Sequence, residues 1–171
     1  GAVGVRTNHD LLAAVREANP GAHILYKPHP DVLSGGRVGA VEAKAGADFD
    51  DQVTDIAMPD LLERVDEVHT MTSLTGFEAL LRGKRVVTYG LPFYAGWGLT
   101  EDHAATPRRT RRRSLDELVA ATLLLYPVYA DPDSGDLINA ETAVERLAQQ
   151  RDTTTSLPLI SRIYRWVRRP F

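Results

Sequence analysis

The first feature that could carry chemistry is a histidine held between two prolines, in the segment Lys27-Pro28-His29-Pro30. Each proline fixes its own φ angle and biases the preceding residue toward an extended backbone, so the imidazole has little freedom. A protonated imidazole in this setting can donate a hydrogen bond to a leaving phosphate and neutralise the charge that develops there. His29 is therefore a candidate catalytic residue. The structural alternative is a turn that ends a strand and exposes a histidine.

The second feature is the hydroxyl-rich segment Thr72-Ser73-Leu74-Thr75, followed by Glu78. Small hydroxyl residues between a strand and a helix place unpaired N–H groups and hydroxyls at the positive end of the helix, which suits a phosphate. A carboxylate about one turn further on can accept two hydrogen bonds from a ribose diol. The alternative is that Ser73 or Thr75 only caps the helix and that Glu78 only interacts with the helix dipole.

The third feature is a loop between Tyr89 and His103 that combines several aromatic residues with several glycines. Glycine allows positive φ angles and close backbone approach, and aromatic rings can pack on a base or a sugar. Tyr94, Trp97 and Asp102 are therefore candidate contacts to a sugar or an acceptor. The alternative is a loop that folds on a small core of its own.

The elements that position these features alternate along the chain. Short apolar runs at residues 22–27, 67–71 and 85–89 predict strands, and amphipathic segments at 8–18, 58–65, 75–82 and 114–125 predict helices. Asn8 or Asp10 is the expected cap of the first helix, and Ser114 with Glu117 forms a capping box. The predicted fold class is α/β, a Rossmann-like parallel sheet with helices on both faces, whose ligands bind beyond the carboxyl ends of the strands.

Composition excludes several classes of function. The 171 residues contain no cysteine, which removes disulfides, thiolate nucleophiles and Cys-ligated zinc, and a net charge of −3 gives no footprint for nucleic acid. No metal-ligand spacing, P-loop, dinucleotide-binding or nucleophile-elbow motif occurs, and the isolated His9, His23 and His69 receive no role. No apolar run approaches the ~20 residues that cross a bilayer. We expect a cytoplasmic protein without a metal.

Together these segments resemble the capsule polysaccharide synthesis family, and within it the KpsC-type β-Kdo transferases of Gram-negative bacteria. The resemblance covers roughly residues 8–150 and includes the segments 90–100 and 124–132. The aromatic-glycine loop is its specific part, because sialyltransferases and CDP-glycerol transferases of GT-B fold also carry a His-Pro pair.

The resemblance implies a retaining transferase that uses CMP-Kdo to build an oligo-Kdo linker on a lysophosphatidylglycerol or phosphatidylglycerol acceptor. It also implies a peripheral protein that acts at the cytoplasmic face of the inner membrane and needs no cofactor. His29 is then the residue that contacts the donor phosphate and assists the leaving group. The donor-binding residues carried over from the motifs are Lys27, Pro30, Thr72, Ser73, Thr75, Gly76 and Glu78.

A GT-B enzyme has two Rossmann-like lobes with the active site between them, and this chain supplies one. The resemblance therefore implies the C-terminal, donor-binding half of a GT-B module, which partners an upstream lobe that holds the carboxylate nucleophile. Alone, the chain is expected to bind the donor without catalysing transfer. Two other readings stay open: an enzyme similar to CDP-glycerol glycerophosphotransferases, and a noncatalytic flavodoxin-like binding module.

The end of the chain has a different composition. We expect a nucleotide-sugar-binding lobe over residues 1–150, then a polar linker and a basic amphipathic helix over residues 151–171. From residue 157 onward, apolar and aromatic residues alternate with four arginines and no acidic residue. This is the composition of a helix that lies on an anionic membrane surface. The alternative is that the segment packs on the Rossmann-like core.

Overall fold

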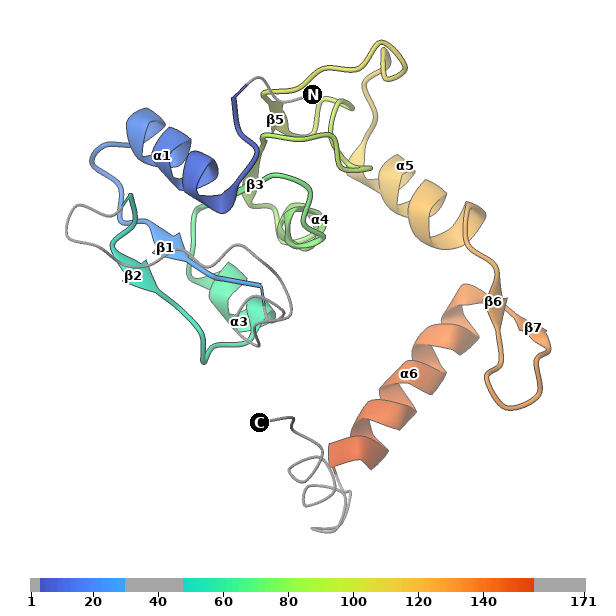
Figure 1. Ribbon diagram of the computed structural model, residues 1–171. Coiled ribbons are helices and arrows are strands. Elements are labelled where there is room, and N and C mark those ends of the chain that lie inside the picture. The colour runs from blue at the N-terminus through green and yellow to red at the C-terminus, as the bar shows by residue number, and fades with distance from the viewer. Residues whose placement is uncertain (1–3, 30–47, 156–171) are drawn as a thin grey trace. The chain divides into compact units, whose positions relative to one another are not determined.

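The computed structural model describes residues 4–29 and 48–155. The chain divides into two compact units, Gly1–Leu118 and Val119–Phe171 (Figure 1). The division falls inside the lobe that was expected over residues 1–150. The expected domain boundary at residue 150 stays a prediction.

The first unit contains short strands between helices, and all of its strand pairs are parallel. The strands β1 and β2 pair with each other, and the order in the second sheet is β3-β4-β5. In chain order the elements are α1 (Asn8–Ala18), β1 (Leu25–Tyr26), β2 (Asp51–Gln52), α3 (Met58–Glu63), β3 (Glu67–Thr70), α4 (Thr75–Leu80), β4 (Arg85–Thr88) and β5 (Glu101–Asp102).

Helices lie on both faces of the β3-β4-β5 sheet. Val87 and Tyr89, on one face, join a buried cluster with Leu12 and Val15 of α1. Successive strand residues point to opposite faces, so Val86 points to the other face, where α4 contacts β3 and β4 (Figure 1). The expected α/β fold, with parallel strands and helices on both faces, is confirmed.

The N-cap of the first helix lies one residue before the positions that were expected. Thr7 is the N-cap: its hydroxyl accepts a hydrogen bond from the Asp10 N–H at 3.1 Å, and the Asp10 carboxylate accepts one from the Thr7 N–H at 2.9 Å. The prediction that Asn8 or Asp10 is the cap is therefore wrong. Asp10 stands at the third helical position, where it completes a capping box instead.

The sequence-based boundaries hold for β3, β4, α3 and α4 within one or two residues, while other parts differ. β1 has two residues in place of the six expected, and β2 and β5 were not predicted. The capping box at the start of α5 (Leu115–Val119) is confirmed: the Glu117 N–H donates to the Ser114 hydroxyl at 3.1 Å, and the Ser114 N–H donates to the Glu117 carboxylate at 2.8 Å.

The second unit begins at the end of α5, where the helix continues as the π-helical segment η1 (Ala120–Leu125). The Tyr126 N–H donates to the Ala121 carbonyl at 3.0 Å, a bond that spans five residues, as in a π-helix. An antiparallel hairpin of β6 (Tyr129–Ala130) and β7 (Leu137–Ile138) follows, then α6 (Ala140–Thr155).

The helix α6 continues into the segment that was predicted to be a linker. α6 runs to Thr155, so the prediction of a linker that starts at residue 151 is wrong for residues 151–155. The rest of the predicted linker and the basic C-terminal helix lie outside the described residues. Within the part of the chain that the structure describes, no helix is both long enough and apolar enough to cross a bilayer.

Candidate functional site

The β3-β4-β5 sheet has one edge from which three loops leave. Because the strands are parallel, the segments that follow Thr70, Thr88 and Asp102 all start at the carboxyl edge of the sheet. This is the edge at which open α/β sheets bind ligands. The predicted hydroxyl-rich segment and the aromatic-glycine loop therefore start from the same edge.

Hydrogen bonds hold the hydroxyl-rich segment in a defined turn between β3 and α4. The Ser73 N–H donates to the hydroxyl of Thr70, a buried residue at the end of β3, at 3.1 Å. The Ser73 hydroxyl accepts from the Thr75 N–H at 3.2 Å and contacts the Thr75 hydroxyl at 3.1 Å. Thr72 and Ser73 remain exposed, so their hydroxyl groups are accessible to a ligand.

The turn also rests on a buried tyrosine from the aromatic-glycine loop. Tyr94 is 0% exposed, and its hydroxyl donates to the Ser73 carbonyl at 2.5 Å. Gly76 lies against the same ring, so closely that a Cβ at this position would overlap the Tyr94 phenol. Burial raises the pKa of Tyr94, which keeps its hydroxyl protonated and able to donate. The structure thus joins the second and third sequence features.

Around Tyr94 the aromatic rings form a small cluster. Phe77 of α4 meets Phe93 edge-on with ring centroids 5.0 Å apart, and Phe93 meets Tyr94 edge-on at 5.2 Å. Such pairs add to the stability that burial alone provides. The ring of Tyr94 is buried and supports the turn. Its expected contact with a sugar stays a prediction.

A glycine at the start of the loop allows it to approach the β3–α4 turn. A Cβ on Gly90 would lie 2.6 Å from the Met71 carbonyl oxygen and 2.9 Å from Cγ2 of Thr72. Any side chain at this position would therefore push the two segments apart. The close contact fixes the position of Thr72 relative to the loop.

Asp102 organises the far end of the loop. Its carboxylate accepts hydrogen bonds from the Thr88 hydroxyl at 2.8 Å, the Thr100 hydroxyl at 2.6 Å and the Gly96 N–H at 2.9 Å. Thr88 is completely buried, so the bond ties β5 to the centre of the sheet. These three bonds give Asp102 a structural role, and its expected contact with a sugar stays a prediction.

Trp97 is half-buried at the base of the same loop. Its indole N–H donates to the Phe93 carbonyl at 2.8 Å, and the guanidinium of Arg109 lies over its ring, 5.6 Å from the centroid. The neighbouring Gly96 and Gly98 both have φ of +78°, a conformation that favours glycine. The expected contact of Trp97 with a ligand stays a prediction.

The remaining donor-site candidates lie on α4 and after β1. Glu78 is half-buried in the first turn of α4. His29 is exposed, two residues beyond Lys27, whose ammonium group donates to the Ile56 carbonyl at 2.8 Å. Pro30 lies outside the described residues. β1 pairs with β2 and does not belong to the β3-β4-β5 sheet. The expected approach of His29 to Ser73 and Glu78 stays a prediction.

One polar network received no role in the sequence analysis. His69 donates from Nε2 to Glu67 at 2.6 Å, and its Nδ1 lies 3.3 Å from the Tyr89 hydroxyl. Glu67 also pairs with Arg85 at 2.6 Å. Burial lowers the pKa of His69, and the Glu67 carboxylate opposes this effect. The strand pairing that assembles these groups joins residues far apart in the sequence, and no local pattern signals it.

The same face continues to β5. The Tyr89 ring stacks on His103 with centroids 4.4 Å apart and planes 5° from parallel. Burial raises the pKa of Tyr89. His103 is exposed at the carboxyl edge, so this stack lies at the border of the candidate site. In the described ranges, 4–29 and 48–155, no three His, Asp or Glu side chains are grouped to hold a metal ion.

Comparison with known proteins identifies the family. Residues 3–130 match the model of the capsule polysaccharide biosynthesis protein family. Over 153 residues the chain is 54% identical to the capsule polysaccharide modification protein LipA of Neisseria meningitidis serogroup B, covering 89% of this chain and 22% of LipA. It is 45% identical to the lipopolysaccharide-processing protein LpsZ of Rhizobium meliloti, covering 85% of this chain and 33% of LpsZ.

Two solved structures from Thermosulfurimonas dismutans share the fold. The KpsC β-Kdo 2,7 transferase matches with a TM-score of 0.75 and 44% identity, over 88% of this chain and 48% of that chain. The KpsC β-Kdo 2,4 transferase matches with a TM-score of 0.72 and 41% identity, over 81% and 43%. The chain spans at most a third of its curated relatives and less than half of these transferases. It is one α/β lobe of the GT-B-like type, and it belongs to the capsule polysaccharide biosynthesis family, in its KpsC-type branch.

Proposed function

We propose that this chain is the donor-binding lobe of a retaining β-Kdo transferase that uses CMP-Kdo. The observation that carries the proposal is the similarity to two solved Kdo transferases at 44% and 41% identity, with TM-scores of 0.75 and 0.72. The chain covers 48% and 43% of those proteins, which fits one lobe of a two-lobed enzyme. The companion lobe then supplies the acceptor site and the carboxylate nucleophile.

The proposed donor site lies at the carboxyl edge of β3. There the exposed hydroxyls of Thr72 and Ser73 donate to the anionic oxygens of the donor, either its phosphate or its sugar carboxylate. The Ser73 and Thr75 hydroxyls contact each other at 3.1 Å, and a ligand oxygen would replace this contact. Glu78 accepts hydrogen bonds from the ribose diol, as acidic residues do in related folds.

Tyr94 and Gly76 supply the rigidity that such a site needs. The buried tyrosine holds the Ser73 carbonyl, and the absence of a side chain at Gly76 lets the ring lie against α4. A turn that is fixed before the ligand arrives loses less conformational entropy on binding. Removal of this support is therefore expected to weaken donor binding without any direct contact to the ligand.

His29 has the chemical role in the proposal. When the bond between the anomeric carbon and the phosphate oxygen breaks, negative charge appears on CMP. A protonated imidazole donates a hydrogen bond to that oxygen and lowers the barrier. Retention of configuration then requires two displacements through a carboxylate of the companion lobe. The scheme uses no metal and no other cofactor.

The proposed acceptor is a lysophosphatidylglycerol or phosphatidylglycerol glycolipid, on which the enzyme builds the oligo-Kdo linker of a capsular polysaccharide. The proposed place of action is the cytoplasmic face of the inner membrane, where the protein is peripheral. The family match to capsule polysaccharide biosynthesis and the similarity to Kdo transferases support this proposal.

The test is a transfer assay with the full-length enzyme and a lipid acceptor. CMP-Kdo should give a Kdo-modified product and release CMP, while CDP-glycerol should give no product with the same acceptor. Ser73→Ala should reduce the rate at low donor concentration at least tenfold. Arg64→Ala, an exposed change on the loop after α3, should leave the rate unchanged. Turnover of CDP-glycerol, or none with either donor, overturns the proposal.

A further inference from the structure

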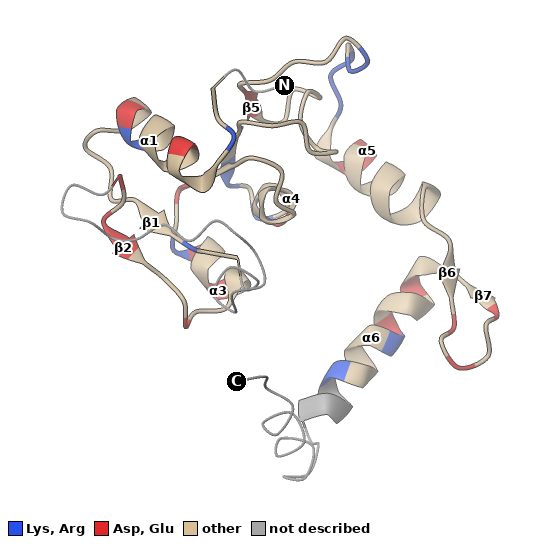
Figure 2. Cartoon of the chain, in the orientation of Figure 1, with Lys and Arg blue, Asp and Glu red and all other residues tan. Residues whose placement is uncertain are grey.

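The loop between β5 and α5 carries a dense positive charge. Five arginines lie within residues 107–113, here called the arginine loop, and Figure 2 shows them as a basic stretch before α5. Arg113 forms a salt bridge with Glu117 at 3.1 Å. In the part of the chain that the structure describes, the other four have no carboxylate partner. Most of this charge is therefore not neutralised by the described residues of the unit.

Part of the arginine loop is tied to the aromatic-glycine loop. Arg109 donates to the carbonyls of Pro92 at 2.5 Å and Ala95 at 2.8 Å, and the Arg113 N–H donates to the Trp97 carbonyl at 2.9 Å. Neutral carbonyl groups hold a guanidinium in place without cancelling its charge. The loop thus has a defined position relative to the carboxyl edge of the sheet.

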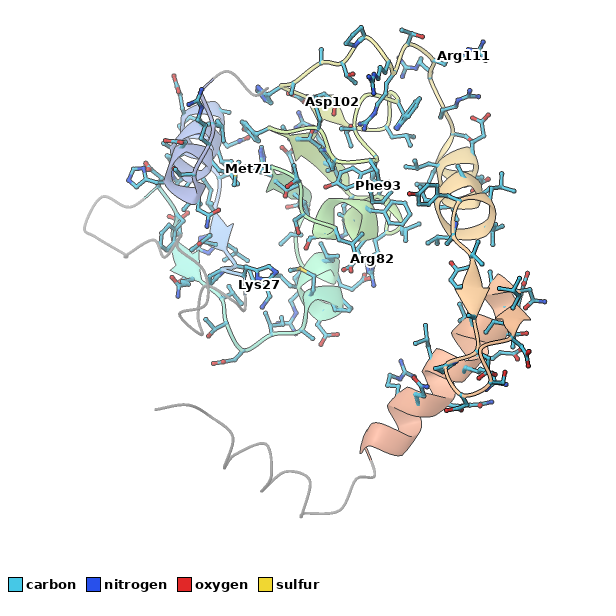
Figure 3. All side chains as sticks on the ribbon, turned by 45° about the vertical axis from the view of Figure 1, so that its right-hand side comes forward. Lys27, Met71, Arg82, Phe93, Asp102 and Arg111 are labelled. Carbon is cyan, nitrogen blue, oxygen red and sulfur yellow. The ribbon has the colours of Figure 1, made fainter. Side chains whose placement is uncertain are left out.

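Arg108 and Arg111 are exposed, and Figure 3 shows Arg111 at the outer side of the loop. Arg112 is also exposed, but its guanidinium donates to the Gly98 carbonyl at 3.4 Å and so lies against the aromatic-glycine loop. Small anionic ligands bind in concave sites that cover most of their surface. Charges on the outside of a loop suit an extended anionic surface instead, and arginines near such a surface each add to the attraction.

We propose that the arginine loop docks this lobe on anionic phospholipid headgroups of a membrane. This inference rests on the proposed function, because the loop starts at the same edge as the proposed donor site. Docking through the loop holds that edge near the bilayer, where a lipid-linked acceptor is located. The loop is thus a membrane-binding element separate from residues 157–171.

The test measures binding of the full chain to vesicles of phosphatidylcholine and phosphatidylglycerol in equal parts, with phosphatidylcholine alone as the neutral surface. Arg108→Ala/Arg111→Ala removes two exposed arginines and leaves in place the hydrogen bonds of Arg109, Arg112 and Arg113 to the aromatic-glycine loop. Arg6→Ala/Arg64→Ala is the matched control, because it removes two other exposed arginines and changes the net charge equally.

Each arginine at an anionic surface contributes roughly a fivefold gain in partition, so the loop variant should bind roughly 25-fold more weakly. The control should change less than about threefold, and the difference should shrink at high salt. All variants retain residues 157–171, so the comparison reports on the loop. Equal binding of both variants, or equal binding to the neutral vesicles, overturns the proposal.

Two further readouts separate this inference from the alternatives. Both variants should bind CMP like the unmodified chain; a chain that binds anionic vesicles through the loop but does not bind CMP contradicts the proposed function alone. Capture on polyglutamate beads tests an acidic protein as the partner. If the loop variant loses this capture while its vesicle binding is unchanged, the membrane proposal is wrong.

Discussion

Replacement of Gly76 by alanine gives a test in which local propensity and tertiary packing predict opposite signs. Gly76 lies inside α4, where alanine is favoured over glycine by about 1 kcal/mol. However, the added Cβ would lie 2.6 Å from Cζ and 2.8 Å from Cε2 of Tyr94, and closer still to its hydroxyl oxygen. A ring that is 0% exposed has no free space to move into.

Overpacking of this kind costs about 1–3 kcal/mol, and the close contact to three ring atoms places Gly76→Ala near the upper end. After the propensity gain is subtracted, the net loss of unfolding free energy should be about 1–2 kcal/mol. Tyr94→Phe alone removes the hydrogen bond to Ser73 and should cost about 1 kcal/mol. Tyr94→Phe also removes the hydroxyl oxygen, the atom that a Cβ at Gly76 would overlap most. The combined variant Gly76→Ala/Tyr94→Phe should therefore lose at least ~0.5 kcal/mol less unfolding free energy than the sum of the losses in the two single variants.

The assay is urea unfolding, followed by far-UV circular dichroism and by tryptophan fluorescence, to which Trp97 in the adjoining loop contributes. Gly21→Ala is the control: this glycine is exposed, and a Cβ there would meet nothing within 4 Å, so the change should stay within about 0.5 kcal/mol. A Gly76→Ala variant as stable as the unmodified chain, or strict additivity in the double variant, would refute the packing of Tyr94 against α4.

Three other predictions concern the site and its supporting network. His29→Ala in the full-length enzyme should reduce turnover by about a hundredfold in a steady-state assay while the circular dichroism spectrum stays unchanged, and near-normal turnover would leave His29 only a structural role. Asp102→Ala removes the partner of the buried Thr88 hydroxyl and of two other donors, so it should lower the unfolding free energy by about 3 kcal/mol in urea; a loss below ~1 kcal/mol would contradict its role. Because the pKa of His69 lies below 6.5 in the folded state, the unfolded state binds more protons as pH falls. The stability that His69 contributes should be complete above about pH 6.5 and should decrease at lower pH. The midpoint of urea unfolding, measured from pH 5 to 7.5, should therefore depend less on pH in His69→Gln than in the unmodified chain.

Much of the first unit could be predicted from sequence because its elements have strong local signals. The apolar runs of β3 and β4 are bounded by turns, and α4 ends before Gly83, which has a φ of +67°. The capping box of Ser114 and Glu117 is likewise local, and the structure contains it. The hydroxyl-rich segment and the aromatic-glycine loop each follow a predicted strand. If these strands are parallel, both segments must start at the carboxyl edge of the sheet.

Features that depend on long-range contacts could not be predicted. β5 consists of two acidic residues, and its strand pairing is supported by the ion pair of Glu101 with Arg85 and by the bond of Asp102 to Thr88. Neither residue type favours a strand. The burial of Tyr94 is similar: an aromatic residue in a loop suits a ligand contact as well as a core, and no local pattern predicts its packing against Gly76.

Calorimetric titration of CMP into the chain tests whether a nucleotide binds at the turn between β3 and α4. We expect saturable one-to-one binding that weakens about tenfold or more in Ser73→Ala and in Glu78→Ala, since each loses a charge-assisted hydrogen bond. Arg64→Ala should bind CMP like the unmodified chain. Absence of saturable binding, or equal affinity in all of these variants, would show that the nucleotide does not bind at this turn.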